Sequence, residues 1–190
     1  HLIPIIDAGV KIEDGYDSYE EGRDKGYFCK RVDGSDFEAC VWPGWTHFPD
    51  FLNKDAREWF GSKYKVLIDQ GIDGFWNDMN EPAIFYSREG IDALDECVKE
   101  TAGEKLDAKP GKLEEHFNKL QNNPKDYEQF YHNVNGKMVR HDKVHNLYGY
   151  YMTRAAGEAF SKLAPNKEIL MFSRASYIGM HRYGGIWTGD

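Results

Sequence analysis

Gly71-Ile-Asp-Gly-Phe-Trp-Asn-Asp-Met-Asn-Glu81 is the stretch of sequence that indicates the fold. Its apolar centre, Gly74-Phe-Trp76, is short and lies between turn-forming residues, which is typical of a buried strand in a parallel sheet. Asp78 and Glu81 follow this run directly. In a parallel α/β barrel, functional side chains gather at the carboxyl ends of the strands. The stretch therefore predicts a strand over residues 73–77 that delivers two carboxylates to such a rim.

Three more strand patterns and two helix patterns lie on either side of this stretch. We expect strands over residues 2–6, 168–173 and 184–187, and helices over residues 53–70 and 143–163 with Asn53 and Asp142 as caps. Pro4 fits poorly in a central strand, because proline has no N–H for the ladder. The alternation of strands and helices predicts an α/β fold with a parallel sheet and right-handed crossovers. Four strands are too few for a closed barrel of eight, so we expect residues 1–190 to form one partial (β/α)8 TIM barrel.

The remaining segments are expected to be loops and an insertion. Residues 11–41 are polar and contain several glycines, which predicts a long excursion with a hairpin around Asp33-Gly34. Residues 41–50 combine aromatic residues with proline, which would hold the rings in place in a rigid loop. Residues 86–140 are densely charged and carry two short amphipathic patterns. We expect them to form a helical insertion on the rim, with a solvated charged surface.

Composition excludes some classes of partner and leaves others open. The 24 Lys and Arg residues against 32 Asp and Glu residues give a net charge of -8. This balance argues against nucleic acid and against an anionic membrane surface, because both favour a basic face. Aromatic residues make up 15% of the chain. Their rings either stack on the apolar faces of sugars or fill the core, and composition alone leaves both alternatives open.

The sequence contains no pattern for a metal, a phosphate or a membrane span. Cys29, Cys40 and Cys97 lie far apart without a CxxC motif, which indicates free thiols in a reducing compartment. The histidines lack a metal spacing such as HExxH, and no P-loop is present, so we expect no metal and no cofactor. No apolar stretch approaches the roughly 20 residues of a membrane span. There is no signal-peptide pattern and no N-x-Ser/Thr sequon, so we expect a cytoplasmic location.

A polar or aromatic group follows each predicted strand. These groups are Asp7, Asp78 with Glu81, Arg174, and Trp187 with Asp190. On a barrel they would converge on one face. Glycoside hydrolysis requires two acids from different strands, one carboxylate that attacks the anomeric carbon and one carboxylic acid that protonates the leaving oxygen. Retaining enzymes hold this pair about 5–5.5 Å apart and inverting enzymes about 6.5–9.5 Å apart, and the sequence does not give that distance.

Two motifs resemble the active-site signatures of glycoside hydrolase family 31. Trp76-Asn-Asp-Met-Asn-Glu81 is similar to the nucleophile signature, and Trp187-Thr-Gly-Asp190 is similar to the acid/base motif. The resemblance implies that Asp78 is the nucleophile and Asp190 the general acid/base of a retaining enzyme. It also implies that the chain covers about strands three to six of the barrel, with residues 86–140 inserted after the fourth strand.

The resemblance extends to the pocket around these acids. It implies substrate-binding roles for Ile5, Trp42, Trp76, Met79, Phe85, Arg174 and Trp187. Ser173-Arg174, followed by Tyr177-Ile-Gly179, is similar to the family segment whose arginine binds the sugar and the nucleophile. His145-Asn-Leu-Tyr-Gly-Tyr150 is similar to the helix start after the fourth strand.

Several of these residues have a structural alternative. Asp7 either anchors the loop behind the pocket or contacts the sugar, and the first role is favoured. Glu81 is expected to orient its neighbours, because the family places the acid in the Trp-x-Gly-Asp motif. Trp42, Trp76 and Trp187 are either core residues or sugar platforms, and their positions at strand ends or in a rigid loop favour sugar stacking.

The predicted activity is that of a retaining exo-acting α-glucosidase, which removes terminal non-reducing α-linked glucose from oligosaccharides or disaccharides. Asp-Met-Asn-Glu is the form seen in α-glucosidases of the family, whereas its α-xylosidases tend to carry glycine after the nucleophile. The alternatives are an α-xylosidase, a transglucosidase or an α-glucan lyase of the same family, and a catalytically incomplete carbohydrate-binding fragment. Linkage preference and oligomeric state stay open. We expect the 190-residue chain alone to be inactive and to aggregate, because an open barrel exposes sheet edges.

Overall fold

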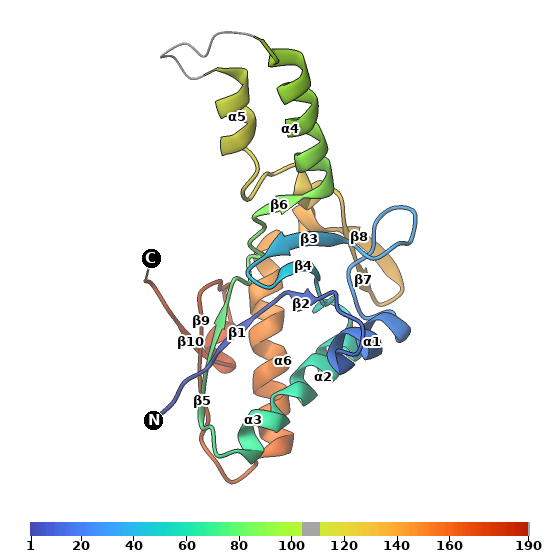
Figure 1. Ribbon diagram of the computed structural model, residues 1–190. Helices are drawn as coiled ribbons and strands as arrows, with labels where there is room; N and C mark the ends of the chain where they lie inside the picture. Colours follow the sequence, from blue (N-terminus) through green and yellow to red (C-terminus); the bar gives the residue numbers. More distant parts are fainter. Residues whose placement is uncertain (104–110, 190) are drawn as a thin grey trace.

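The sheet that carries the predicted carboxylates has four strands (Figure 1). A computed structural model describes residues 1–103 and 111–189. The strands are β1 (Ile5–Asp7), β5 (Gly74–Asp78), β9 (Leu170–Ser173) and β10 (Gly185–Ile186). Their order in the sheet is their order in the chain, and every neighbouring pair is parallel. The α/β fold with a parallel sheet is therefore confirmed.

The ends of these strands differ slightly from the prediction. β1 starts at Ile5, so that Pro4 lies just before it. The Pro4 carbonyl accepts a hydrogen bond from the backbone N–H of Trp76 (3.1 Å). Proline thus contributes only an acceptor to the sheet, which its missing N–H allows. β9 and β10 are each shorter than expected.

The two faces of the sheet have different surroundings, because successive side chains of a strand alternate between faces. Asn77 points to one face and is fully buried. Trp76 and Asp78 point to the other, where their register partners on β1 are Ile5 and Asp7. Ile5 is 53% exposed. The predicted site residues of β1 and β5 therefore share one open face of the sheet.

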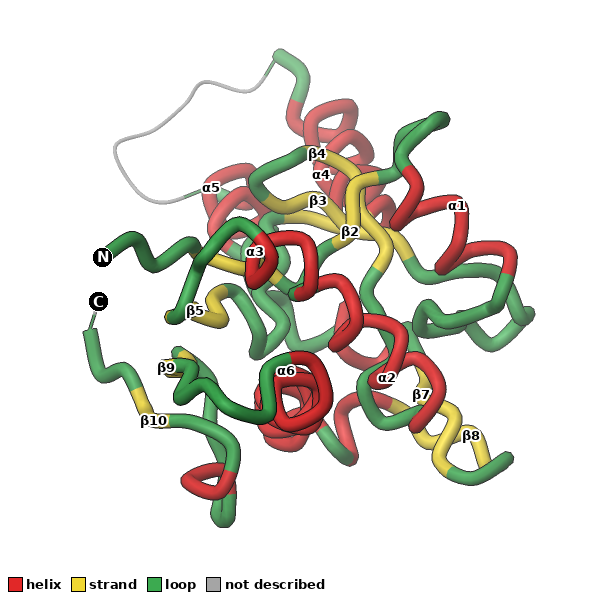
Figure 2. The backbone as a smooth tube through the Cα atoms, turned by 90° about the horizontal axis from the view of Figure 1, so that it is seen from below, coloured by secondary structure: helices red, strands yellow, loops and turns green. Residues whose placement is uncertain are grey.

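Three helices cover the buried face: α2 (Lys54–Lys63), α3 (Lys65–Asp69) and α6 (Tyr148–Leu163). Figure 2 shows α6 end-on beside β9, with α2 and α3 alongside it. Phe75 of β5 stacks on Phe160 of α6, with ring centroids 5.4 Å apart. A Cβ atom on Gly61 would lie 2.5 Å from the Ala155 carbonyl oxygen, so glycine is what lets α2 and α6 pack this closely. Within the described ranges, no helix is both long and apolar enough to cross a membrane.

The helix predicted over residues 53–70 is divided into α2 and α3, which meet at Tyr64. Asn53 caps α2 as predicted, since its side-chain oxygen accepts from the Asp55 N–H (3.0 Å). The Tyr64 ring is buried, and its hydroxyl donates to Asn77 Oδ1 (2.6 Å). Helical periodicity contains no information about such a contact with a distant strand, so it could not predict the break.

The helix predicted over residues 143–163 begins only at Tyr148. Two 3-10 turns, η2 (His141–Lys143) and η3 (His145–Leu147), precede it. The prediction that Asp142 caps this helix is wrong. Its carboxylate instead accepts from Arg140 Nε (2.7 Å) and pairs with Lys143 Nζ (2.9 Å). Two cations therefore take the place of the helix N–H groups as its partners.

A second, antiparallel sheet stands beside the first. Its order is β2 (Val10–Lys11), β4 (Gly44–His47), β3 (Glu38–Val41) and β6 (Tyr86–Ser87). The predicted rigid loop over residues 41–50 is thus largely a hairpin, in which Trp42 and Pro43 connect β3 to β4. Pro43 lies in the turn and costs the ladder no hydrogen bond, while Gly44 takes the positive φ (+98°) that the turn requires.

Residues 11–41 contain more structure than expected. Helix α1 (Asp17–Asp24) lies within them and was not predicted. Asp33-Gly34 forms a turn, in which the Ser35 N–H donates to Asp33 Oδ1 (3.0 Å), and a single bridge joins Lys30 to Asp36. The turn was predicted correctly, but no full hairpin follows from it because the ladder stops after one bridge.

Residues 86–140 contain the two expected helices, α4 (Arg88–Thr101) and α5 (Lys112–Asn118), which project from the body in Figure 1. After the short turn η1 (Asp126–Glu128), β7 (Tyr131–Val134) and β8 (Lys137–Arg140) form a hairpin that was not predicted. Asn135 and Gly136 both take positive φ in its turn, which is the Asn-Gly signal of a two-residue hairpin. This two-residue turn signal is local and lies in the sequence itself.

Candidate active site

The carboxyl ends of β5 and β9 bring together an arginine and two carboxylates. Arg174 donates from Nε to Glu81 Oε1 (2.9 Å) and from Nη2 to Glu81 Oε2 (2.8 Å). Its Nη1 forms an ion pair with Asp78 Oδ1 (3.1 Å). A planar guanidinium suits this arrangement, because it can fork onto one carboxylate and still reach a second. Arg174 thus fixes Asp78 and Glu81 relative to each other.

Met79 lies between these two acids and takes part in the same group. Arg174 Nη2 lies 3.2 Å from the Met79 sulfur. Met79 is buried and has a φ of +55°, a left-handed conformation that costs a residue with a Cβ atom about 1–2 kcal/mol. Its carbonyl accepts from the Ala83 N–H (3.1 Å), which helps to hold this turn. Backbone strain of this kind clusters at functional sites.

Asp7 stands beside Asp78, since the two residues are register partners in neighbouring strands. Burial raises the pKa of the Asp7 carboxyl, the charge of Asp78 raises it further, and Arg174 opposes the shift. Asp7 therefore takes up a proton at a higher pH than an ordinary aspartate does.

Two buried polar side chains link the ends of β5 and β9. Asn80 Nδ2 donates to Ser173 Oγ (2.9 Å), and Asn80 Oδ1 accepts from the Ala175 N–H (3.1 Å). Ser173 Oγ in turn donates to the Ala175 carbonyl (2.8 Å). These bonds flank Arg174 on both sides and hold the backbone from which it extends. Asn80 was not among the predicted site residues, although it lies inside the motif that contains Asp78.

Trp76 and Trp187 lie together on the open face of the sheet. Their ring centroids are 4.4 Å apart with an interplanar angle of 56°, and Trp76 also stacks on Phe172 (5.9 Å, 20°). Both tryptophans are half-buried, and Ile5 continues the same apolar face. The structure thus brings three of the predicted substrate-binding residues into one wall next to Asp78.

Trp42 and Phe85 form a separate aromatic pair on the second sheet. Trp42 is 74% exposed at the β3–β4 turn, and its ring meets Phe85 edge to face (4.9 Å, 89°). The Phe85 N–H donates to the Cys40 carbonyl (2.9 Å), which fixes this pair where β6 joins β3. At this exposure the Trp42 ring is not part of the core formed by the described residues.

Asp190, the predicted acid/base, lies outside the described residues. Its role and its distance from Asp78 therefore stay predictions. The residues before it leave the sheet at the carboxyl ends of the strands, where Asp78 lies. There the Trp187 N–H donates to the Ser173 carbonyl (3.0 Å) at the end of β9.

Cys29, Asp50 and His132 are close enough together to resemble a metal site. The Asp50 carboxylate is already satisfied by His132 Nδ1 (2.7 Å), the Asn133 N–H (2.6 Å) and the Leu52 N–H (3.2 Å). Burial raises the pKa of the Cys29 thiol well above its usual range, which disfavours the thiolate that a metal needs. Hydrogen bonding accounts for this cluster, and we assign no metal to it.

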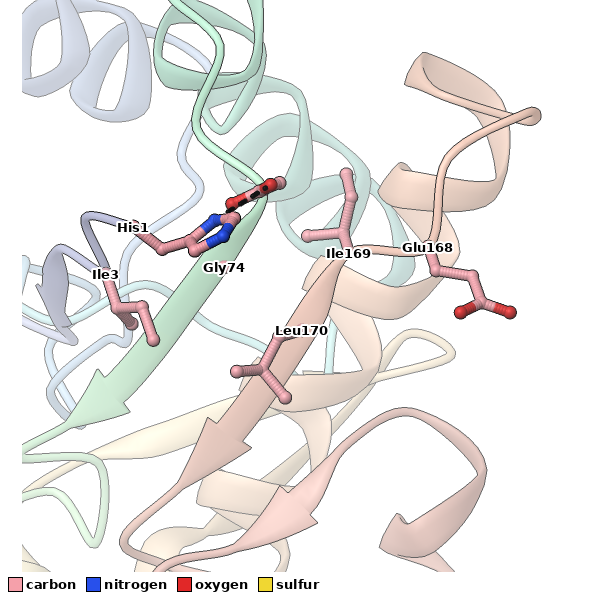
Figure 3. Close-up of a pocket in the computed structure, with 7 residues that line it drawn as sticks. His1, Ile3, Gly74, Glu168, Ile169 and Leu170 are labelled. Carbon is pink, nitrogen blue, oxygen red and sulfur yellow. Dashed lines mark ion pairs between the residues drawn. The ribbon is translucent and has the colours of Figure 1, made fainter.

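A hollow of about 480 Å³ lies at the opposite end of the strands (Figure 3). Its lining includes Ile3, Gly74 and Leu170, and an ion pair joins His1 to Asp73 at its edge (3.5 Å). Gly74 and Leu170 are the first residues of β5 and β9, whereas Asp78 and Arg174 follow their carboxyl ends. The hollow is therefore separate from the carboxylate group.

All 190 residues match the model of the glycosyl hydrolases family 31 TIM-barrel domain. The chain belongs to glycoside hydrolase family 31. It is 33% identical over 189 residues to alpha-glucosidase 2 of Bacillus thermoamyloliquefaciens and 35% identical over 190 residues to an alpha-glucosidase of Saccharolobus solfataricus. Both matches include the whole of this chain but only 20% and 25% of those two proteins.

The structural comparison agrees with the sequence comparison. The family 31 dextranase of Flavobacterium johnsoniae, solved in complex with glucose, superimposes with a TM-score of 0.67 at 25% sequence identity. The match covers 99% of this chain and 18% of the dextranase. The chain thus spans a quarter or less of the length of these relatives.

Proposed function

We propose that the protein containing this domain is a retaining exo-acting α-glucosidase. Its substrates would be oligosaccharides or disaccharides with a terminal non-reducing α-linked glucose. Membership in family 31 supports a glycoside hydrolase, and the two α-glucosidase relatives support the sugar. The glucose complex of the similar dextranase supports an α-glucoside substrate as well.

The contact of Arg174 with both Asp78 and Glu81 is the observation that carries this proposal. A carboxylate nucleophile must be ionised and aimed when the sugar arrives. The guanidinium stabilises the negative charge of Asp78, and the fork on Glu81 prevents the guanidinium from turning away. Asp78 lies at the carboxyl end of its strand, where barrel enzymes carry out their chemistry.

The proposed reaction has two steps. In the first, Asp78 forms a bond to the anomeric carbon, while the glycosidic C–O bond breaks and Asp190 gives its proton to the leaving oxygen. In the second, Asp190 takes a proton from water, and the water oxygen displaces Asp78 from the anomeric carbon. The anomeric configuration is retained because the carbon is inverted twice.

The aromatic residues have a consistent place in this proposal. The wall formed by Trp76 and Trp187 would contact the apolar face of the cleaved glucose and exclude water from the bond to Asp78. Trp42 is exposed and its ring packs on the half-buried Phe85, and this pair would contact the next sugar of the substrate. Each ring provides apolar area at a small cost in side-chain entropy.

The proposal is tested by hydrolysis of 4-nitrophenyl α-glucoside and α-xyloside with the full-length natural protein. Asp78→Asn keeps the size of the side chain but removes the nucleophile, so the rate should fall by about 10⁴-fold or more. Asp69→Asn, an exposed change on α3, is the matched control and should leave the rate within about twofold of the parent. NMR of the first product should show α-glucose, as retention requires.

Four outcomes would test this assignment against its alternatives. Preference for the xyloside would indicate an α-xylosidase, and transfer of glucose to a second sugar would indicate a transglucosidase. Substantial activity in Asp78→Asn would overturn the assignment of the nucleophile. Sugar binding without turnover by the full-length protein would favour a carbohydrate-binding role.

A further inference from the structure

Four polar side chains from separate segments form one continuous hydrogen-bonded series inside the protein. His132 Nδ1 bonds to Asp50 Oδ1 (2.7 Å), His132 Nε2 to His141 Nδ1 (2.8 Å), and His141 Nε2 to His145 Nδ1 (2.8 Å). Asp50, His132 and His141 are buried, and His145 is half-buried. A loop, a hairpin strand and two 3-10 turns contribute these residues, so the series is a tertiary feature of the fold.

The Asp50 end sets the direction of every bond in the series. Both oxygens of Asp50 accept backbone N–H groups, from Leu52 (3.2 Å) and Asn133 (2.6 Å), so the carboxylate acts as an acceptor toward His132 as well. His132 must therefore carry its proton on Nδ1 and leave Nε2 as an acceptor. Cys29 and Tyr148 also face His132, and burial raises the pKa of both, which keeps them uncharged.

The same pattern of donor and acceptor nitrogens continues through His141 and His145. His141 donates from Nδ1 to His132 and accepts at Nε2, and His145 then donates from Nδ1 to His141. Burial lowers the pKa of His141 well below its usual range, the charges of His132 and His145 would lower it further, and Asp142 opposes them. In the form with three neutral rings, Nε2 of His145 carries no proton, and no hydrogen bond to this atom is found among the described residues.

His145, at the far end of the series, is joined through Tyr127 to the loop that carries Glu81. Tyr127 of η1 packs its ring on His145 (centroids 4.6 Å apart) and donates from its hydroxyl to the Pro82 carbonyl (3.1 Å). The charge of Glu81 reaches both rings: it raises the pKa of Tyr127 together with burial, and it opposes the lowering of the His145 pKa by burial. His141 and Tyr127 therefore contact His145, and the charge of Glu81 acts on it as well.

The first turn of α6, which follows His145, contacts the loops after β5 and β9. A Cβ atom on Gly149, in the first turn of α6, would lie 2.6 Å from Ala175 Cβ and 2.9 Å from the Asn80 carbonyl oxygen. The loops after β5 and β9 therefore rest directly on this turn. A shift of η3 and α6 would move the backbone on both sides of Arg174.

We propose that Asp50, His132, His141 and His145 form a positioning series for the active site, which holds His145 and the loop of Glu81 in place so that Glu81 stays paired with Arg174. The inference rests on the proposed function, because the role of Arg174 is to hold Asp78. When His145 takes up a proton, its imidazolium becomes a second cation for Glu81. Glu81 then divides between two partners, and the fork that fixes Arg174 is weakened.

The series predicts a specific pH dependence. Burial lowers the pKa of His145, so the proton is taken up below the ordinary range of histidine and the loss appears on the acid limb of kcat/KM. A merely structural role for the histidines would alter stability but would not add a titration to this limb.

The test is the pH profile of kcat/KM of the full-length protein with 4-nitrophenyl α-glucoside. His145→Asn keeps a donor in the position of Nδ1 but cannot take up a proton, so its acid limb should move to lower pH by about 0.5 unit or more. His145→Phe removes the donor as well and should lower kcat about tenfold while KM changes less. The asparagine variant should restore part of that loss.

His47→Asn is the matched control, because His47 is also buried but bonds through Nδ1 to the Phe37 carbonyl (2.8 Å), away from the series. Its acid limb should coincide with that of the parent. An unchanged acid limb in His145→Asn, with Asp78-dependent hydrolysis intact, would overturn this inference alone. If the parent shows no Asp78-dependent hydrolysis, the proposed function fails and the positioning role fails with it.

Discussion

Asp7 and Asp78 occupy facing positions on neighbouring parallel strands. Their shared face is reached by one guanidinium, that of Arg174, which forms an ion pair with Asp78 and also acts on the charge of Asp7. Two adjacent carboxylates with one cation between them cannot both be fully compensated. Burial first, and then the charge of Asp78, raises the pKa of the Asp7 carboxyl, and Arg174 opposes this shift.

Asp7→Asn should therefore stabilise the protein near pH 7. The ionised Asp7 is disfavoured in the folded state, and its site is half exposed, so water screens the effect and the gain should stay below about 1 kcal/mol. A group whose folded pKa is raised loses this penalty as the pH falls, so the gain should shrink through the folded pKa and vanish below the ordinary value of 3.8. Thermal midpoints of variant and parent at several pH values check this, and a gain that persists at low pH would contradict it.

Arg174→Lys should lower kcat by about 100-fold with a smaller change in KM. Lysine keeps the positive charge but cannot fork onto Glu81 and reach Asp78 at the same time. Steady-state kinetics on the aryl glucoside provide the measurement. Arg182→Lys, an exposed change on η4 (Met180–Arg182), is the control and should leave kcat nearly unchanged. Equal effects of the two changes would show that the fork has no special role.

Gly149→Ala should destabilise the protein by about 1–3 kcal/mol, because its added methyl group meets both Ala175 and the Asn80 carbonyl. The same change should reduce kcat, since Arg174 lies beside Ala175. Gly111→Ala has open space around its added methyl group and is the control. Thermal unfolding and kinetics on the full-length protein measure both effects. A stable, fully active Gly149→Ala would show that these loops can move freely.

The 190-residue chain, expressed alone, should be inactive and prone to aggregate. The open face of the parallel sheet exposes the large apolar side chains of Ile5 and Leu170, and Ile186 is exposed on the edge strand β10. Exposed apolar patches and unpaired strand edges favour association between molecules. Light scattering and hydrolysis assays on the purified chain test this, and soluble monomer that hydrolyses the aryl glucoside would refute it.

Much of the parallel sheet could be predicted from local sequence. The apolar run before Asp78 is the strand Gly74–Asp78, and the strands ending at Asp7 and Ser173 lie where alternation of strands and helices requires them. The resemblance to the family also identified Arg174, and the structure places it on Asp78. Short apolar runs and strand ends are local properties, and this is why they were readable.

The remainder depended on contacts between distant segments. The break at Tyr64 coincides with a bond from its hydroxyl to Asn77, and Asn80, after β5, bonds to Ser173 of β9. No period or spacing indicates either bond. The hairpin at Asn135-Gly136 is different, because its turn signal is local and predicts the hairpin from sequence alone.

The projecting pair α4 and α5 starts and ends at nearly the same place. The chain leaves β6 at Ser87, and beyond α5 Asn122 is bonded twice to Ile84, through its backbone N–H (2.7 Å) and its side chain (2.9 Å). An excursion whose two ends are fastened together puts little strain on the body, whatever its length. This arm is therefore a suitable insertion site for protein engineering. A reporter or a binding module could be inserted there while the barrel strands keep their register.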